Sequence, residues 1–353
     1  MGHPLPEVER RSVMRRVVLC AVLTVLIAVP ATASPTRRAR VATRFIVSMQ
    51  KPNGSFATGL SPVGTAADAV MSLVAARRGR DAIRLATGYL ERQVDKGNVG
   101  DIGLASKVAM AAVAAGANPK RFGGENLVKD IRSTQQPDGR FGESTPVFHH
   151  ALAMLALAAA GTPPSPLAAD WLASAQCVDG GWQFTEPATE ADDEHCFNAD
   201  MGSDFFTSDT NTTSLAVQAL AVAPGTLEPG VDAFTYFELA RDPIRGGWGY
   251  SHELTLTDAN STALVLQAHT AAGANVPEGA AKALAELQYR RCGKRPGAFA
   301  FTWLDENEDG VYRKRSGPDL AATVGAIPGL LRLAFPIGHA DVTKNRVRVP
   351  SCP

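Results

Sequence analysis

A short turn pattern recurs along this chain and constrains its fold more than any other feature. In each full copy a glutamine is followed four residues later by glycine and six residues later by an aromatic residue, as in Gln176–Trp182, Gln50–Phe56 and Gln135–Phe141. Glycine can adopt the left-handed backbone that ends a helix without a side-chain penalty. The pattern therefore predicts a helix end, a tight turn and an aromatic side chain that plugs it.

Three partial copies bring the number of turns to six. Asp242–Trp248 keeps the glycine and tryptophan without the glutamine, Gln288 and Phe299 keep both ends with a longer spacing, and a weak copy lies at Gln93–Val99. The intervals are roughly 40–60 residues, which is typical of an array of one supersecondary unit.

Two helices are expected between successive turns. Asp209 and Asp258 each open a capped, alanine-rich helix, and the two copies match almost position by position. Looser copies begin near Thr65, Ile102, Val147 and Asp319. An amphipathic helix precedes the turns, as at Glu125–Gln135, Pro166–Gln176, Val231–Arg241 and Glu278–Gln288. The first is expected at Val41–Gln50, after a frayed basic start at Thr36–Arg40. Six such hairpins predict an all-α fold, an (α/α)6 toroid of inner and outer helices.

The repeated turn and its alanine-rich helix resemble the QW repeat of squalene–hopene cyclases and the related prenyltransferase repeat. The resemblance covers residues from about 41 to 335. It implies the terpenoid cyclase/protein prenyltransferase α/α toroid. It constrains function only weakly, because that toroid also serves binding proteins.

The first 33 residues are typical of a secretory signal peptide. Four arginines precede the apolar run Val17–Val29, and Ala31–Ala33 forms a small-x-small cleavage site. The run is short for a transmembrane helix, although an uncleaved anchor is the alternative. We expect a secreted protein that is cleaved before Ser34 and has no stable membrane span afterwards. The toroid then comprises residues 34–335, and residues 336–353 form an extended tail.

Charge and cysteine content narrow the class further. The chain has 35 basic and 35 acidic residues, so no basic surface suggests a nucleic-acid partner. Outside the leader there are four cysteines, and an even number in an exported chain predicts two disulfides. Three pairings are possible, of which we favour Cys177–Cys196 and Cys292–Cys352.

The resemblance also indicates which chemistry is missing. It places the proton-donating D-x-D-D-T motif of the cyclases on Asp209–Thr213 or on Asp258–Thr262. Asn211 and Asn260 stand where the middle acid belongs, and an amide cannot protonate an alkene. The Asp-x-Cys of the zinc prenyltransferases is absent. Both chemistries are disfavoured, and the sequence leaves open whether the protein is an enzyme.

Two acidic insertions lie between a turn aromatic and the next inner helix, after Trp182 and after Phe299. Equivalent positions in the repeat place both at one rim of the ring, where long loops are usually functional or disordered. In the second insertion, Asp305, Asn307 and Asp309 stand at calcium-loop positions before Gly310. A solvated acidic turn is the alternative, because the bidentate glutamate of such a loop is missing.

These features favour binding of an amphipathic or cofactor-like small molecule at the rim of the central cavity. The alternatives are a terpenoid cyclase-like or polysaccharide-active enzyme, and a cell-surface protein-interaction module. For the aspartates at helix starts, simple N-capping is the competing interpretation. The candidate ligand-binding residues are Asp204, Phe205, Phe206, Asp209, Asn211, Asp258, Asn260, His149, Trp303 and Asp319.

Overall fold

The computed structural model describes residues 34–56, 61–142, 145–185, 207–223, 229–289 and 295–345. The contacts divide the chain into two units, Met1–Ala33 and Ser34–Pro353, and the described residues belong to the second. Twelve α-helices lie in this part of the chain: α1 Pro35–Ser48, α2 Pro62–Ala75, α3 Arg80–Asp95, α4 Ile102–Ala114, α5 Leu127–Ser133, α6 Val147–Ala159, α7 Pro166–Ser174, α8 Thr210–Val222, α9 Ala233–Leu239, α10 Ala259–Ala271, α11 Ala280–Glu286 and α12 Leu320–Leu331.

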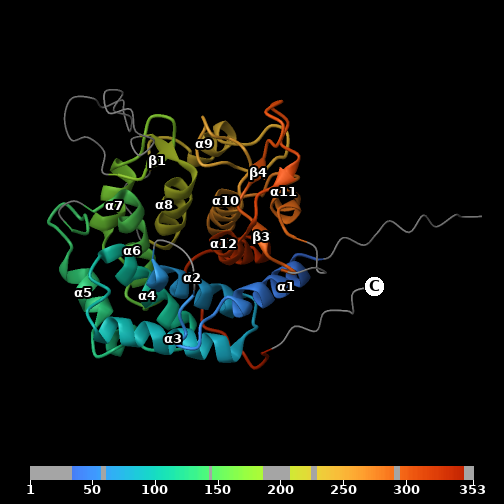
Figure 1. Cartoon of the computed structure of the whole chain (residues 1–353). Helices are drawn as coiled ribbons and strands as arrows, with labels where there is room; N and C mark the ends of the chain where they lie inside the picture. The colour runs from blue at the N-terminus through green and yellow to red at the C-terminus, as the bar shows by residue number, and fades with distance from the viewer. Residues whose placement is uncertain are drawn as a thin grey trace, which may run out of the picture. The chain divides into compact units, whose positions relative to one another are not determined.

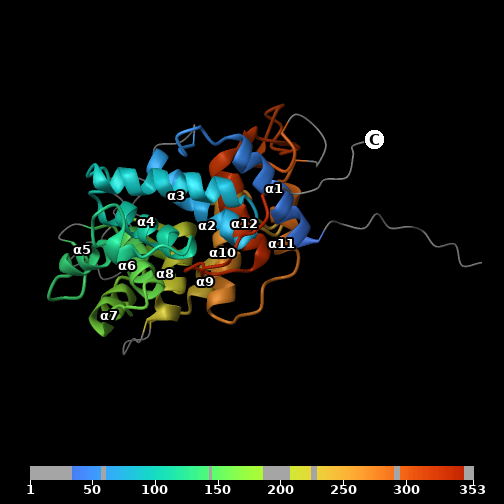
Figure 2. The same ribbon diagram turned by 90° about the horizontal axis from the view of Figure 1, so that it is seen from below.

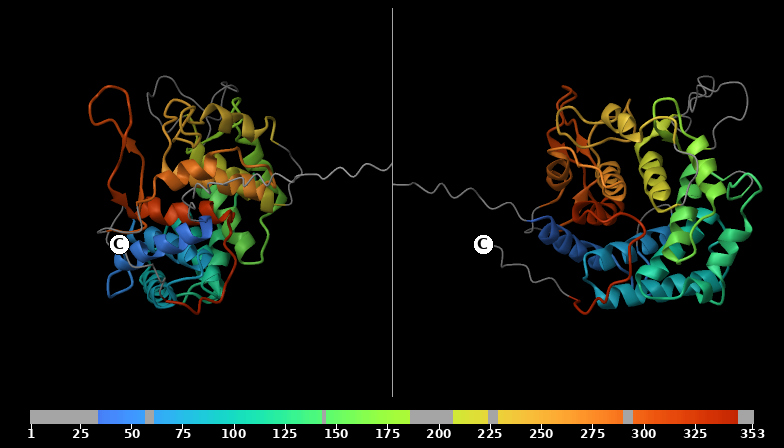
Figure 3. Two further views of the ribbon diagram at one scale, coloured as in Figure 1. Left: turned by 90° about the vertical axis from the view of Figure 1, so that its right-hand side faces the viewer. Right: turned by 180° about the vertical axis from the view of Figure 1, so that it is seen from behind.

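The even-numbered helices form a closed inner ring. Each packs against the next, from α2 through α4, α6, α8 and α10 to α12, and α12 packs back against α2 (Figures 1 and 3). The odd-numbered helices lie outside them, and α1 packs against both α12 and α2. This arrangement confirms the predicted (α/α)6 toroid.

The inner helices are mostly apolar, because each packs against its neighbours in the ring and against outer helices. Alanine, leucine and valine dominate their sequences, and close helix approach favours the smaller side chains. Gly329 shows how close the approach is, since a Cβ there would lie 2.7 Å from Ala263 Cα. Asp68 of α2 and Lys107 of α4 are the two charged residues within the inner helices.

In four of the turns the repeated glutamine fastens the turn to the next outer helix. Gln176 Nε2 donates to the carbonyl oxygens of Gly180 (2.9 Å) and Val231 (2.7 Å), and its Oε1 accepts from the backbone N–H of Val231. Gln50 and Gln288 donate to the equivalent pair of carbonyl oxygens, and Gln135 donates to Gly139 O and to the Ser165 hydroxyl. The glutamine is therefore the link between successive hairpins.

Where a turn carries an aromatic residue, that residue is a buried plug. Trp182 and Trp248 are fully buried, and their indole N–H groups donate to Leu172 O and Phe237 O, both at 2.7 Å. Their backbone N–H groups donate to the hydroxyls of Thr213 and Thr262 in the first turn of the following inner helix. These threonines thus have a structural role in the repeat.

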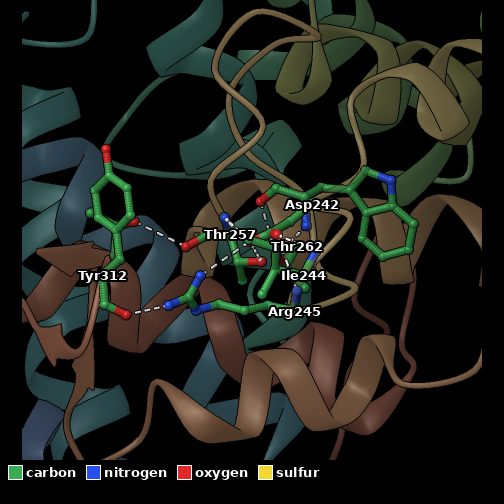
Figure 4. A network of polar contacts seen from close by, with 8 residues as sticks. Asp242, Ile244, Arg245, Thr257, Thr262 and Tyr312 are labelled. Atoms are coloured by element: carbon green, nitrogen blue, oxygen red, sulfur yellow. Dashed lines mark hydrogen bonds and ion pairs between the residues drawn. The ribbon is translucent and has the colours of Figure 1, made fainter. Parts of the chain in front are cut away.

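The fifth turn lacks the glutamine and is held differently. Asp242 Oδ1 accepts from the backbone N–H groups of Ile244 and Arg245, while Oδ2 accepts from the backbone N–H and hydroxyl of Thr257 (Figure 4). Arg241 takes over the link to the next hairpin by donating to Glu278 O. Asp242 and Arg241 together therefore hold this turn and link it to the next hairpin, as one glutamine does in other turns.

The start of α1 corrects one expectation. Residues Thr36–Arg40 are helical rather than frayed, because Ser34 caps the helix and Pro35 fits its first position. Arg38 donates to Ala285 O and to Gln288 Oε1. These contacts join the first hairpin to the sixth and close the ring, and Figure 2 shows α1 beside α11 and α12.

The chain after α12 crosses the end of the ring at which the inner helices finish. The Phe335 N–H donates to Gln218 Oε1 of α8, His339 Nδ1 lies 3.2 Å from Ala114 O of α4, and Lys344 O accepts from Gly79 N–H. The crossing covers this end of the ring, and Ile337 within it is buried. Within the described residues, no helix has the length and hydropathy needed to cross a membrane.

Candidate functional site

A central cavity of about 290 Å³ lies inside the inner ring. All six inner helices and Phe335 line it, so its wall is continuous around the ring. Most of the lining is apolar, with methionine and leucine side chains from five helices. The apolar lining residues are Met71, Met110, Phe148, Leu152, Leu215, Leu264, Ala321, Val324, Gly325, Pro328 and Phe335.

One ion pair interrupts this apolar wall. Lys107 Nζ lies 3.0 Å from Asp68 Oδ2, and the two side chains are 28% and 31% exposed. Among the described lining residues these are the charged ones. Both come from adjacent inner helices, so the pair occupies one side of the cavity.

Two asparagine side chains lie about one helical turn closer to the start of the inner helices than the Asp68–Lys107 ion pair does. Asn211 of α8 and Asn260 of α10 both line the cavity, each two residues after its N-cap. Ser261 Oγ donates to Asn211 Oδ1 at 3.1 Å. The structure thus places both predicted asparagines in the cavity lining.

The predicted aspartates do not line the cavity. Asp209, Asp258 and Asp319 are the N-caps of α8, α10 and α12, where each carboxylate accepts backbone N–H groups. Burial raises the pKa of Asp209 and of Asp258 to about 6, against the opposing effect of those hydrogen bonds. Their positions favour the capping interpretation.

The buried cap at Asp258 makes stability depend on pH. Its folded-state pKa of about 6 lies above the ordinary value of 3.8, so the folded protein binds more protons between these values. Stability should therefore fall as pH rises from about 4 to about 6.

Replacing Asp258 with asparagine keeps a capping oxygen and removes the titration. We expect a flatter profile of stability against pH, which differs from that of the natural protein by about 2–3 kcal/mol across this window. Urea unfolding at several pH values checks this. Asp101→Asn, at the more exposed cap of α4, is the control, and an unchanged slope in Asp258→Asn would contradict the assignment.

The remaining candidate ligand residues fall in three places. His149 packs edge-on against Phe148 and Phe184 at the start of α6, and burial lowers its pKa. Trp303 lies in strand β4 (Trp303–Leu304), which pairs with β5 (Lys314–Arg315), and the Arg245 guanidinium stacks 4.9 Å from its ring. Neither lines the central cavity. Asp204, Phe205 and Phe206 lie outside the described residues.

The flanks of both insertions lie at the starts of inner helices. Trp182–Gln183 (β1) pairs with Ser208–Asp209 (β2) before α8, and Phe299–Ala300 (β3) pairs with Pro318–Asp319 (β6) before α12. Because the two insertions have equivalent flanks, these positions agree with the prediction that both insertions lie at one rim of the ring. Most of the first insertion lies outside the described residues.

The proposed calcium loop already has internal partners. Asp305 accepts from the backbone N–H groups of Asn307 and Gly310, and Asp309 pairs with Arg313 at 2.7 Å. The described residues contain no cluster of three His, Cys, Asp or Glu side chains able to hold a metal. Calcium binding here stays a prediction, which calorimetric titration with calcium chloride checks.

Cys177 is bonded in a disulfide. Cys196, Cys292 and Cys352 lie outside the described residues, so the pairings Cys177–Cys196 and Cys292–Cys352 stay predictions.

The ion pair is the feature of the cavity that the sequence prediction missed. Asp68 and Lys107 are single charges in helices that are otherwise apolar, and a charge at such a position must find a partner when buried. Their opposite signs on consecutive inner helices were the available signal. Phe335, which also lines the cavity, carried no such signal because it lies beyond the last helix.

No protein-family model matches the chain, and no curated protein matches it in sequence. Solved structures do match its fold. A protein from Actinoplanes has 16% identity and a TM-score of 0.54, with 84% of this chain and 98% of that chain covered. A variant of the type II terpene cyclase MstE from Scytonema, in complex with geranylgeranyl dihydroxybenzoate, has 15% identity and a TM-score of 0.54, covering 84% and 97%. An unsaturated glucuronyl hydrolase specific for heparin has 12% identity and a TM-score of 0.55, covering 84% and 95%. At these identities the likeness shows a shared α/α toroid and does not choose between the activities.

Proposed function

We infer that the protein binds a small amphipathic molecule in the central cavity of the toroid. The observation that carries this proposal is the cavity itself, which has an apolar wall from all six inner helices and one ion pair on its side. Ligand pockets are typically apolar cavities with a few polar groups that fix orientation, and this volume is near the small end of their range. A flat, filled ring would instead have favoured a protein-binding module.

The enzyme alternatives receive less support from the cavity. Glycoside hydrolysis uses two carboxylates that flank the scissile bond, and Asp68 is the one carboxylate among the described lining residues. Protonation of an alkene requires a carboxylic acid in the apolar site, and amides stand at Asn211 and Asn260. Binding without catalysis is therefore the function that the geometry favours.

Filling the cavity should abolish binding. Leu264 lines the cavity and is half-buried, so Leu264→Trp is expected to occupy the space with an indole ring. We expect the fluorescent apolar amine N-phenyl-1-naphthylamine to bind the natural protein and to lose at least tenfold in affinity in this variant. Leu167→Trp, on the exposed side of α7, is the control that adds the same ring outside the cavity. Equal binding by both variants, with unchanged melting temperatures, would argue against the cavity as the site.

The proposal includes export and a relation to the QW repeat. Cleavage before Ser34 would leave intact the residue that caps α1, and the disulfide at Cys177 suits an oxidising compartment. The glutamine contacts at the turns support assigning the repeat to the cyclase type. N-terminal sequencing of the exported protein should begin at Ser34, and a product that retains residues 1–33 would contradict this part of the proposal.

A further inference from the structure

Two glutamines occupy equivalent positions near the ends of adjacent inner helices. Gln218 of α8 and Gln267 of α10 are both nine residues after their N-caps, and both side-chain Nε2 groups donate to the carbonyl four residues earlier. That bond fixes the amide orientation, since a flip would turn the side-chain oxygen toward a carbonyl. The side-chain oxygen of each is therefore left as an acceptor.

The two acceptors differ in what they bind. Gln218 Oε1 accepts the Phe335 N–H at 2.8 Å, whereas Gln267 Oε1 is buried and has no hydrogen-bond partner within the described part of the chain. A buried acceptor without a donor costs about 1–3 kcal/mol, so such a group calls for an explanation. Gln267 also lines the central cavity, and Gln218 is not among its lining residues.

Gln267 lies at a different depth and on a different wall from the ion pair. It follows Asn260 by seven residues, about 10 Å along α10, whereas the ion pair lies about one helical turn past the level of the asparagines. Around the ring, α10 is three helices from α4, so Gln267 is opposite the helix that carries Lys107. Apolar side chains such as Leu264 and Met110 line the intervening wall. The cavity thus has polar groups on facing walls, with apolar side chains between them.

The Asp68–Lys107 ion pair determines which polar group of a ligand suits that side of the cavity. Asp68 and Lys107 together carry no net charge, and the rest of the described lining is uncharged. A hydroxyl can donate to the carboxylate and accept from the ammonium group without adding charge. A carboxylate or an amine would leave a net charge in an apolar cavity, which is costly.

We propose that the cavity selects an uncharged apolar molecule with a hydroxyl at one end for the Asp68–Lys107 pair and a second hydrogen-bond donor at the other end for Gln267 Oε1. This inference rests on the proposed binding function and narrows its ligand class. The second donor supplies the partner that Gln267 lacks, in the way that the Phe335 N–H serves Gln218.

Three ten-carbon probes test the proposal by displacing N-phenyl-1-naphthylamine from the natural protein at pH 8. We expect 1,10-decanediol to bind about five- to tenfold more tightly than 1-decanol, which is the effect of one added hydrogen bond. Decanoic acid, ionised at this pH, should bind at least tenfold more weakly than 1-decanol. In Gln267→Leu the advantage of the diol over the alcohol should disappear while 1-decanol still binds.

Gln218→Leu is the matched control, because it removes the same amide from a position whose acceptor is already occupied. It should lower the melting temperature and leave the diol-to-alcohol ratio unchanged. A ratio near one in the natural protein, or a ratio that Gln267→Leu does not alter, overturns the inference while leaving cavity binding intact. Failure of all three probes to displace the dye overturns the proposed function itself.

Discussion

Replacing Trp182 with alanine is expected to lower the free energy of unfolding by about 3–5 kcal/mol. The indole is fully buried at the fourth turn, and its N–H donates to Leu172 O, so the substitution leaves both a cavity and an unpaired carbonyl. The measurement is urea unfolding followed by circular dichroism.

A second variant separates the plug from its hydrogen bond. Other turns of the same ring use phenylalanine, as at Phe56 and Phe141, so Trp182→Phe keeps an aromatic ring in the turn. We expect this variant to lose about 1–2 kcal/mol, from one hydrogen bond and a smaller ring. Equal losses in the two variants would contradict the role of the aromatic ring as the plug.

Replacing Gly139 with alanine is expected to cost about 3 kcal/mol in the free energy of unfolding. Its φ is +99°, and a Cβ there would lie 2.1 Å from the carbonyl oxygen of Leu167 in α7. The backbone of one hairpin would have to move away from the next. Thermal or urea unfolding of the purified variant measures the loss.

Gly161→Ala is the control for the backbone conformation alone. Gly161 also has a positive φ, +65°, but nothing lies within 4 Å of a Cβ at that position. Its expected cost is about 1–2 kcal/mol. If both glycine variants lost the same stability, the close approach of the turn at Gly139 to α7 would not matter.

The sequence predicted the fold because the repeat encodes contacts that recur from hairpin to hairpin. The glutamine at Gln176 and its copies bind the start of the next outer helix, and the glycine at Gly139 permits that approach. The threonine at Thr213 holds the plug. A pattern that recurs because of these contacts predicts both the hairpin and how it packs against the next hairpin.

Features that occur once were harder to predict. Arg38 ties the start of α1 to Gln288, some 250 residues away, and no local signal indicates this contact. The substitution of Arg241 and Asp242 for the missing glutamine has no second copy to compare with. The crossing of Phe335 beneath the ring likewise depends on its partner Gln218.

The candidate site was predicted in part. Equivalent positions in two repeats pointed to Asn211 and Asn260, and both line the cavity. The same equivalence pointed to Asp209 and Asp258, which cap helices behind the lining. Which side of a helix start faces the centre depends on how the ring closes.

The measurement that most directly tests ligand binding inside the ring is photo-crosslinking with a diazirine derivative of 1-decanol, followed by peptide mass spectrometry. We predict that labelled peptides come from the inner helices, at cavity-lining residues such as Met71, Met110 and Leu264. Excess 1-decanol and the Leu264→Trp substitution should both suppress the labelling. Labels confined to outer helices such as α3 and α7, or labelling that Leu264→Trp leaves unchanged, would contradict a ligand site within the toroid.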